Sequence, residues 1–411
     1  MNAKLIKIII FSCLILTSLS LSASALSEVT KLTIFPQNLA LVEQTKTVSL
    51  EKGINQIIFS PVSEGIILDS VYSCAEGCQF LEEEFISPST ISWKVKSEKD
   101  AEVPFKVLYL TRGIEWEINY QIELGRETKF INLVGWAKVE NKSGVSWGPV
   151  QITFSTRNPS LEEQGELSLK KESSSLEVSS STVRISPGIT TVFPESEKTA
   201  SITSNVTTRW REGKTSYLLL TPTNLDKGQE KRIWLFSLQD IPAKKVYNFD
   251  GEKYGDEVRE EVTFKIEDEL NFILSSGWVY LYGTNSENKK IYLGKKKLPQ
   301  VLPGQMCSIY LGPAKGILGE RVQTFFQEIQ LQPAEEELYN KSIAREYSYR
   351  LIFYNYRSSP VKIKVIEHFY NQWEILESNP PDYIKTDDTV IYQIEVVSQG
   401  KREIQYKARM M

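Results

Sequence analysis

Histidine is nearly absent from this chain of 411 residues, which contains only His368. A histidine cluster for a transition metal needs several imidazoles, and a single residue cannot supply them. The sequence also lacks the glycine-rich loops that bind phosphates or dinucleotides. We therefore expect no metal ligand set, no cofactor and no catalytic residue set. We expect His368 to be a strand residue that faces solvent or pairs with a neighbour.

Cysteine is also scarce, with four residues, one of which lies in the apolar N-terminal run. The others are Cys74, Cys78 and Cys307, too few for a disulfide scaffold. Cys74 and Cys78 flank a short loop that contains a glycine. A local disulfide between them and a pair of free thiols are both open at this stage. The fold must therefore rest on apolar cores, for which the chain is long enough.

Long apolar runs are absent after the N-terminus. The one run, Ile8–Leu21, follows Lys4 and Lys7 and ends in the small residues Ser22–Ala25. It is shorter than the roughly 20 residues that span a bilayer. These features are typical of a secretory signal peptide, which we predict over residues 1–25. We then expect no transmembrane span after cleavage, and export to the periplasm, the cell surface or the extracellular space.

Neither sign of charge dominates, because 48 lysines and arginines stand against 52 aspartates and glutamates, for a net charge of −4. A mildly acidic chain with mixed charges gives no electrostatic reason to bind nucleic acid. For an exported protein, an envelope protein or a surface polysaccharide is then the partner that we hypothesise.

The sequence is rich in alternating apolar and polar residues, which are typical of strands with one buried face. Near the C-terminus the alternation covers residues 347–353, 361–365, 390–396 and 404–408. Residues 398–401 predict a hairpin turn between the last two runs. Several strands with short connections predict an immunoglobulin-like sandwich in this region. Farther upstream, Trp278 begins a strand that leads into another hairpin, with its turn at residues 285–288.

The chain as a whole is predicted to be all-β, with tandem sandwich-like domains and very little helix. After the signal peptide we expect an N-terminal β domain at 26–95, a central β-sandwich at 96–325 and a C-terminal immunoglobulin-like domain at 326–411. A segment rich in serine and charge interrupts the central domain at about 158–205. Its composition predicts a flexible loop, with one short strand at Thr182–Ile185.

Several motifs together resemble one family. Residues 113–120 fit the pattern G-x-x-W-x-x-x-Y, and residues 137–147 fit most of A-x-V-x-N-x-T-G-E-D-W, with Ser143, Val145 and Ser146 at three of its positions. Further matches lie at residues 38–42, 150–159, 277–282, 292–294, 303–305 and 310–313. This set resembles the mucoidy inhibitor A-like family, whose central domain is catalogued as a domain of unknown function. The resemblance implies a β-rich envelope protein and brings no established catalytic residues. Many members carry a coiled coil after the N-terminal domain, and this chain has none.

The main functional interpretation is a secreted or cell-envelope protein that works as a non-enzymatic binding or structural module. The alternative is a carbohydrate-binding or carbohydrate-active protein. A glycosidase would use two carboxylates, for which Glu115 and Glu117 are the candidates. Trp116 and Trp278 are the aromatic residues that we expect to contact a ligand, although packing in the core is the more usual role of such residues.

Overall fold

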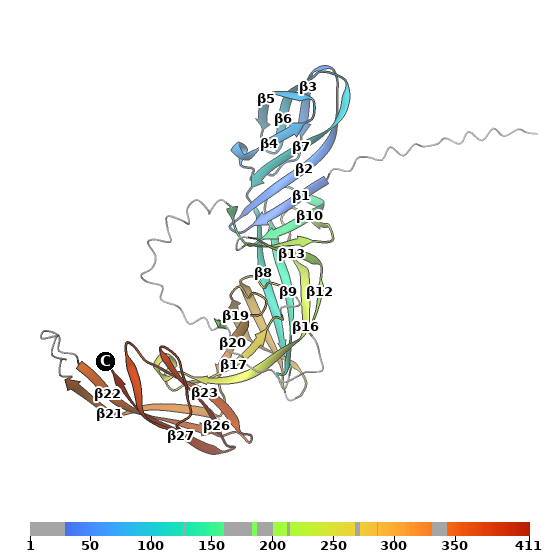
Figure 1. Ribbon diagram of the computed structural model, residues 1–411. Coiled ribbons are helices and arrows are strands. Elements are labelled where there is room, and N and C mark those ends of the chain that lie inside the picture. Colours follow the sequence, from blue (N-terminus) through green and yellow to red (C-terminus); the bar gives the residue numbers. More distant parts are fainter. Residues whose placement is uncertain are drawn as a thin grey trace, which may run out of the picture.

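The computed structural model describes residues 29–125, 128–159, 183–186, 200–211, 214–267, 272–285, 287–330 and 343–411. The predicted signal peptide and most of the serine-rich segment lie outside these residues. Figure 1 shows an elongated molecule with the N-terminal strands at one end and the C-terminal strands at the other. Its described helices are the short 3-10 turn η1 (Leu68–Ser70) and the four-residue α2 (Gly251–Tyr254). The predicted all-β class with sandwich-like domains is confirmed. No helix among the described residues has the length and apolar character needed to cross a bilayer.

The N-terminal part packs a small sheet against one end of a large sheet. Trp93 is buried between them, with ring centroids of Phe59 at 6.2 Å and Phe105 at 5.0 Å. In spatial order the large sheet contains β13 (Val206–Arg211), β14 (Lys214–Leu219), β10 (Trp147–Ser155), β1 (Val29–Phe35), β2 (Leu39–Leu50), β7 (Ala101–Thr111) and β4 (Tyr72–Ala75), with β15 (Thr223–Leu225) beside β10. The small sheet contains β3 (Gly53–Phe59), β6 (Thr90–Ser97) and β5 (Cys78–Ile86).

A second large sheet forms the middle of the molecule. The inner faces of its strands share one apolar core, to which Tyr120, Leu133, Phe264 and Ile309 contribute fully buried side chains. In spatial order this sheet contains β11 (Val183–Ser186), β20 (Met306–Pro313), β17 (Val258–Lys265), β16 (Glu230–Phe249), β9 (Phe130–Asn141), β8 (Ile114–Leu124), β18 (Gly277–Thr284) and β19 (Lys290–Leu298), with β12 (Ser201–Ser204) beside β16. The predicted hairpin after Trp278 is confirmed as β18 and β19. The short strand expected at Thr182–Ile185 is present as β11.

The C-terminal part is a sandwich with a core of its own. One layer contains β21 (Ile317–Gln330), β22 (Ile343–Asn355), β27 (Gly400–Met410) and β24 (Trp373–Asn379). The other contains β23 (Val361–His368), β26 (Thr389–Val396) and β25 (Ile384–Lys385). The end of β16 runs parallel to β23, so this 20-residue strand joins the second large sheet to the C-terminal sandwich.

The hairpin predicted at residues 398–401 is wrong. The alternation correctly predicts strands on both sides of this turn, but β26 pairs with β23 and β25, whereas β27 pairs with β22 and β24. The turn therefore carries the chain from one layer of the sandwich to the other. Local alternation gives the face that a strand buries, and it does not give the strand's partner.

The sheets continue across the domain boundaries that the sequence suggests. Strand β7 pairs along its whole length with β2, which joins residues on the two sides of position 95. A single apolar cluster extends from Leu32 to Ile309. The C-terminal core includes Phe249 and Val258 from the second large sheet. The N-terminal and central parts are thus packed as one body.

Candidate functional site

The outer face of the second large sheet carries four side chains in one row across its strands. Trp278 on β18 lies opposite Asn119 on β8, and Asn119 lies opposite Trp136 on β9. Trp136 in turn lies opposite Trp234 on β16. Residues directly opposite each other on neighbouring strands share one face of a sheet. We call these four residues the tryptophan row.

The row points away from the core because its neighbours along each strand point inward. Val279, which follows Trp278, is fully buried. Gly135 precedes Trp136 and lies so close over Phe236 that a Cβ on it would come within 2.5 Å of the ring. Trp278 is 37% exposed, and the other two indoles are half-buried. Period-two alternation thus presents three indoles on the outer side of the sheet.

Asn119, inside the row, has an unpaired carbonyl oxygen. The residue is 7% exposed, and its Nδ2 donates to Glu117 Oε1 at 3.2 Å. Its Oδ1 is buried and accepts no hydrogen bond from any described residue. Leaving such an acceptor unpaired costs about 1–3 kcal/mol. A ligand that moves the side chain covering this oxygen and donates a hydrogen bond would satisfy it. Gln121 lies two residues farther along β8, on the same face. Its amide oxygen accepts a hydrogen bond from Trp136 Nε1 at 3.1 Å.

Cations border the row. Lys295 Nζ lies 4.2 Å and Lys297 Nζ 5.1 Å from the centre of the Trp278 ring. Arg232 lies 4.7 Å from the centre of the Trp136 ring. Cation–π contacts of this kind hold a charge beside an aromatic surface. Among the described residues, none of these three cations forms an ion pair with a carboxylate.

The acidic side chains around the row are partly neutralised. Glu123 accepts from Lys290 Nζ at 2.9 Å, and Glu230 lies 3.2 Å from Lys138 Nζ. The hydrogen bond to Glu230 raises the pKa of Lys138, which keeps this ammonium charged. The unpaired cations therefore give the Trp278 end of the face a positive character.

The structure separates the two tryptophans that the sequence suggested as ligand contacts. Trp278 belongs to the row, whereas Trp116 lies on the opposite face of β8. There its ring centroid is 4.9 Å from that of Phe154, and its Nε1 donates to Ser155 O at 3.0 Å. Trp136 and Trp234 were not anticipated, because only the cross-strand register places them beside Trp278.

The carboxylates suggested for glycoside cleavage do not face each other. Glu115 and Glu117 alternate with inward residues of β8, and both are exposed on the outer face. A glycosidase needs two carboxyl groups that flank the scissile bond. Two carboxylates side by side on one strand lie on the same side of any ligand.

A second pair of carboxylates lies on the small sheet. Glu82 and Glu84 line a surface hollow of about 360 Å³ there, but Glu82 is exposed and paired with Lys94 at 3.2 Å.

A Gly-x-Ser-x-Gly spacing, typical of hydrolase nucleophile elbows, occurs at residues 144–148 and was missed in our interpretation of the sequence. In the structure it spans the end of the connection between β9 and β10 and the first two residues of β10, whereas an elbow would need a strand-to-helix turn. Ser146 Oγ accepts from Lys227 N at 2.9 Å. His368 lies on β23, well separated from β10 in Figure 1, with its Nε2 3.0 Å from Asp250 Oδ2. The serine therefore has no histidine beside it.

A buried ion pair links the layers of the C-terminal sandwich. Glu367 on β23 is 1% exposed, and its carboxylate accepts from Arg321 Nε on β21 and from Tyr406 Oη on β27. Arg321 also lies 3.7 Å from the centre of the Tyr349 ring. Burial raises the pKa of Glu367 and raises that of Tyr406 well above its usual value. Arg321 and Tyr406 both donate to the Glu367 carboxylate, so the three groups satisfy their hydrogen bonds within the sandwich. This indicates a structural role.

The two neighbouring cysteines lie on consecutive strands of different sheets. Cys74 is on β4 and Cys78 on β5, and both are free thiols in the structure. Burial raises the pKa of the Cys78 thiol, which makes it less reactive near neutral pH. The local disulfide remains a prediction for the exported protein. Cys307 is fully buried in the core of the second large sheet.

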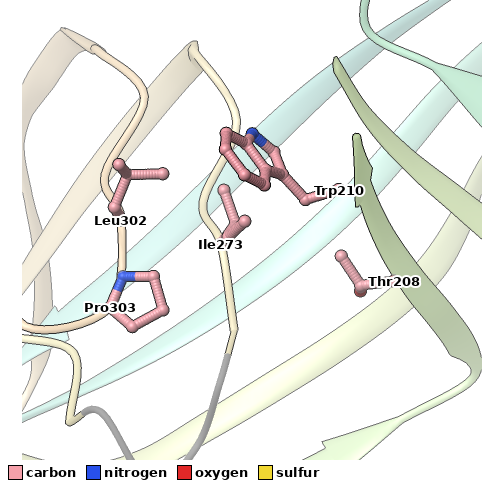
Figure 2. Close-up of a pocket in the computed structure, with 5 residues that line it drawn as sticks. All are labelled: Thr208, Trp210, Ile273, Leu302 and Pro303. Atoms are coloured by element: carbon pink, nitrogen blue, oxygen red, sulfur yellow. The ribbon is translucent and has the colours of Figure 1, made fainter. Parts of the chain in front are cut away.

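A hollow of about 370 Å³ lies beside another exposed tryptophan. Figure 2 shows the Trp210 indole above Ile273, with Leu302 and Pro303 on the neighbouring loop and Thr208 farther along β13. Trp210 is 51% exposed, and Thr208 Oγ1 is buried without a partner among the described residues. Among the described residues, the lining is mostly apolar and contains no charged side chain. None of these residues belongs to the tryptophan row, so Trp210 offers a natural control for it.

Comparison with known proteins places this chain within a family. A search of the curated proteins finds no match to the chain. A family model described as a domain of unknown function, DUF4139, matches residues 105–411. The matched region contains the whole tryptophan row and the C-terminal ion pair, and it makes up well over half of the chain. The protein therefore belongs to the DUF4139 family.

Proposed function

We propose that this protein is an exported, non-enzymatic binding protein of the cell envelope, of the mucoidy inhibitor A-like type. It holds its partner on the outer face of the second large sheet. The observation that carries this proposal is the tryptophan row, which contains three indoles, two of them on either side of an unpaired amide oxygen. Large aromatic side chains supply much of the energy at binding surfaces. A sheet face that carries three such side chains on its outer side is typical of an interaction surface.

The groups that could perform chemistry have structural roles, which also favours binding. Glu367 is held by Arg321 and Tyr406, and His368 is paired with Asp250. Catalytic acids and bases instead face a cleft that a substrate can enter. The tryptophan row lies on a continuous sheet face, which suits an extended partner.

Export is the first testable part of the proposal. The motif at residues 22–25 predicts cleavage after Ala25, so the mature chain should begin near Leu26. Mass spectrometry of the natively produced protein, from separated cytoplasmic and envelope fractions, would measure this. A chain that keeps Met1 and remains in the cytoplasm would contradict the proposal.

Binding through the row is the second part. The mature protein, immobilised and incubated with envelope extract, should retain a specific partner. The double variant Trp136→Ala, Trp278→Ala should retain at least about tenfold less of this partner, because aromatic anchors dominate binding energies. Trp210→Ala removes an exposed indole away from the row and should retain the partner as the wild type does. Equal retention by all three proteins would exclude the row as the binding surface.

A further inference from the structure

We propose that the ligand of the tryptophan row is an acidic polysaccharide, a carbohydrate chain bearing carboxylate groups. Its sugar rings would lie across strands β18, β8 and β9. This inference rests on the proposed binding function and specifies the ligand's chemistry. Three properties of the face carry it: the spacing of its indoles, its amide groups and its unpaired cations.

The spacing of the indoles fits alternate rings of a sugar chain. Trp278 and Trp136 lie on strands separated by β8, and neighbouring strands are about 4.8 Å apart. The two attachment points are therefore about 10 Å apart, which suits two pyranose rings that have one ring between them in the chain. A pyranose ring has one face made of C–H groups, and this face can stack on an indole. Trp234 extends the surface by one more strand.

The amides between the indoles complement the hydroxyl groups of a sugar. Asn119 Oδ1 is buried without a donor, directly between Trp278 and Trp136 in the row. Once the side chain that covers it moves, a sugar hydroxyl at this position can donate to it, which would remove the cost of the unpaired acceptor. Gln121 lies two residues farther along β8 on the same face, and its oxygen already orients Trp136. An aromatic surface with amides at its centre recognises both the apolar and the polar parts of a sugar.

The cations indicate that the sugar is acidic. Lys295 and Lys297 lie over Trp278, and Arg232 lies over Trp136, so positive charge flanks both indoles. Nearby, Glu123 and Glu230 are already paired with Lys290 and Lys138. A carboxylate on a stacked sugar would thus meet unpaired cations, which adds affinity and steers association.

A single-stranded nucleic acid also stacks on aromatic side chains, but it carries a phosphate at every residue and needs a continuous positive groove. Here Glu115 and Glu117 are exposed on the same face, next to Asn119. These two carboxylates interrupt the positive surface that a nucleic acid needs, so the face favours a carbohydrate, whose hydroxyl groups add hydrogen bonds to the stacking contacts.

Calorimetric titration of the mature chain tests this. The probe is polygalacturonate, and the matched uncharged probe is the same polymer with its carboxyl groups methyl-esterified. We expect the charged polymer to bind at least about tenfold more tightly at low salt, with the difference shrinking as salt rises. Trp278→Ala should weaken binding about tenfold, by analogy with the stacking of bases on aromatic rings. Trp210→Ala should bind as the wild type does.

Asn119→Leu separates binding from folding. It removes the unpaired oxygen while keeping a similar shape, so the melting temperature should stay the same or rise. Binding of polygalacturonate should nevertheless weaken about tenfold, because the hydrogen bond from the sugar is lost. A variant that melts normally and binds normally would overturn the role of Asn119.

Three outcomes would overturn the ligand assignment. They are no binding of either polymer, equal affinity for both, and tighter binding of single-stranded DNA at equal salt. These results are distinguishable from failure of the proposed function. If the double variant Trp136→Ala, Trp278→Ala still loses a partner from envelope extract, the row is a binding surface and only its ligand was wrongly assigned.

Discussion

Arg321→Met is expected to lower the free energy of unfolding by about 3–5 kcal/mol. The Arg321 guanidinium lies 2.9 Å from the Glu367 carboxylate, which is 1% exposed. Removing the arginine leaves a buried carboxylate whose remaining partner is the Tyr406 hydroxyl. Burying an uncompensated charge is far more costly than losing an exposed ion pair. Chemical denaturation of the mature protein, followed by circular dichroism, measures the loss.

The loss of unfolding free energy in Arg321→Met should depend on pH. Burial already raises the pKa of Glu367, and removing Arg321 raises it further. In the folded variant Glu367 therefore keeps a proton that the unfolded chain has released. The free energy of unfolding then falls as the pH rises through that interval. The deficit relative to wild type should be smaller at about pH 4 than at about pH 8.

The double variant Arg321→Met, Glu367→Leu is the matched control. It removes both charges and should recover most of the lost stability, because an apolar pair of similar volume can replace a buried ion pair. If the double variant is as unstable as Arg321→Met, or if the deficit is equal at both pH values, an unpaired carboxylate is not the cause.

Phe236→Ala is the second substitution with a large expected effect, about 3–5 kcal/mol of stability. Phe236 is fully buried on β16, with the ring centroid of Phe272 at 4.3 Å and that of Tyr120 at 6.3 Å. Its ring also fills the space beneath Gly135, which precedes Trp136. The cavity should therefore loosen the strand that carries the centre of the row. Thermal unfolding measures the stability, and Trp210→Ala provides an exposed aromatic control that should stay within about 0.5 kcal/mol of wild type.

A double-mutant cycle with Gly135→Ala tests this packing. A Cβ on Gly135 would come within 2.5 Å of the Phe236 ring, so Gly135→Ala alone should cost about 1–3 kcal/mol through overpacking. Combined with Phe236→Ala, the added methyl enters the cavity. The two costs should then sum to more than the cost of the double variant. Strict additivity would show that the two residues are not in contact.

Much of the fold could be predicted from the sequence because strand formation leaves a local pattern. Alternation identified β22, β23, β26 and β27 and the β18–β19 hairpin. It could not identify their partners, because every strand with one apolar face shows the same period. This is why the turn before β27 was interpreted as a hairpin, although it crosses between the two layers.

The candidate site was only partly predictable for a related reason. Trp278 could be recognised from the sequence as a strand residue, because it stands in an alternating run that leads into a hairpin. Trp116 has a similar setting, but the register of β8 directs it inward, to Phe154. Trp136 and Trp234 join Trp278 through pairings between distant strands, and Asn119 became notable only once its oxygen was found unpaired. A row across four strands leaves no signal in any one of them.

Tryptophan oxidation footprinting most directly tests the claim that the protein binds through the tryptophan row. The mature protein would be exposed to a brief pulse of oxidant with and without saturating envelope extract, and each indole would be followed by peptide mass spectrometry. Binding through the row should strongly protect Trp278, protect the half-buried Trp136 and Trp234 more weakly, and leave Trp210 unchanged. Protection of Trp210 with unchanged oxidation of Trp278 would contradict it and would place binding at the hollow beside β13.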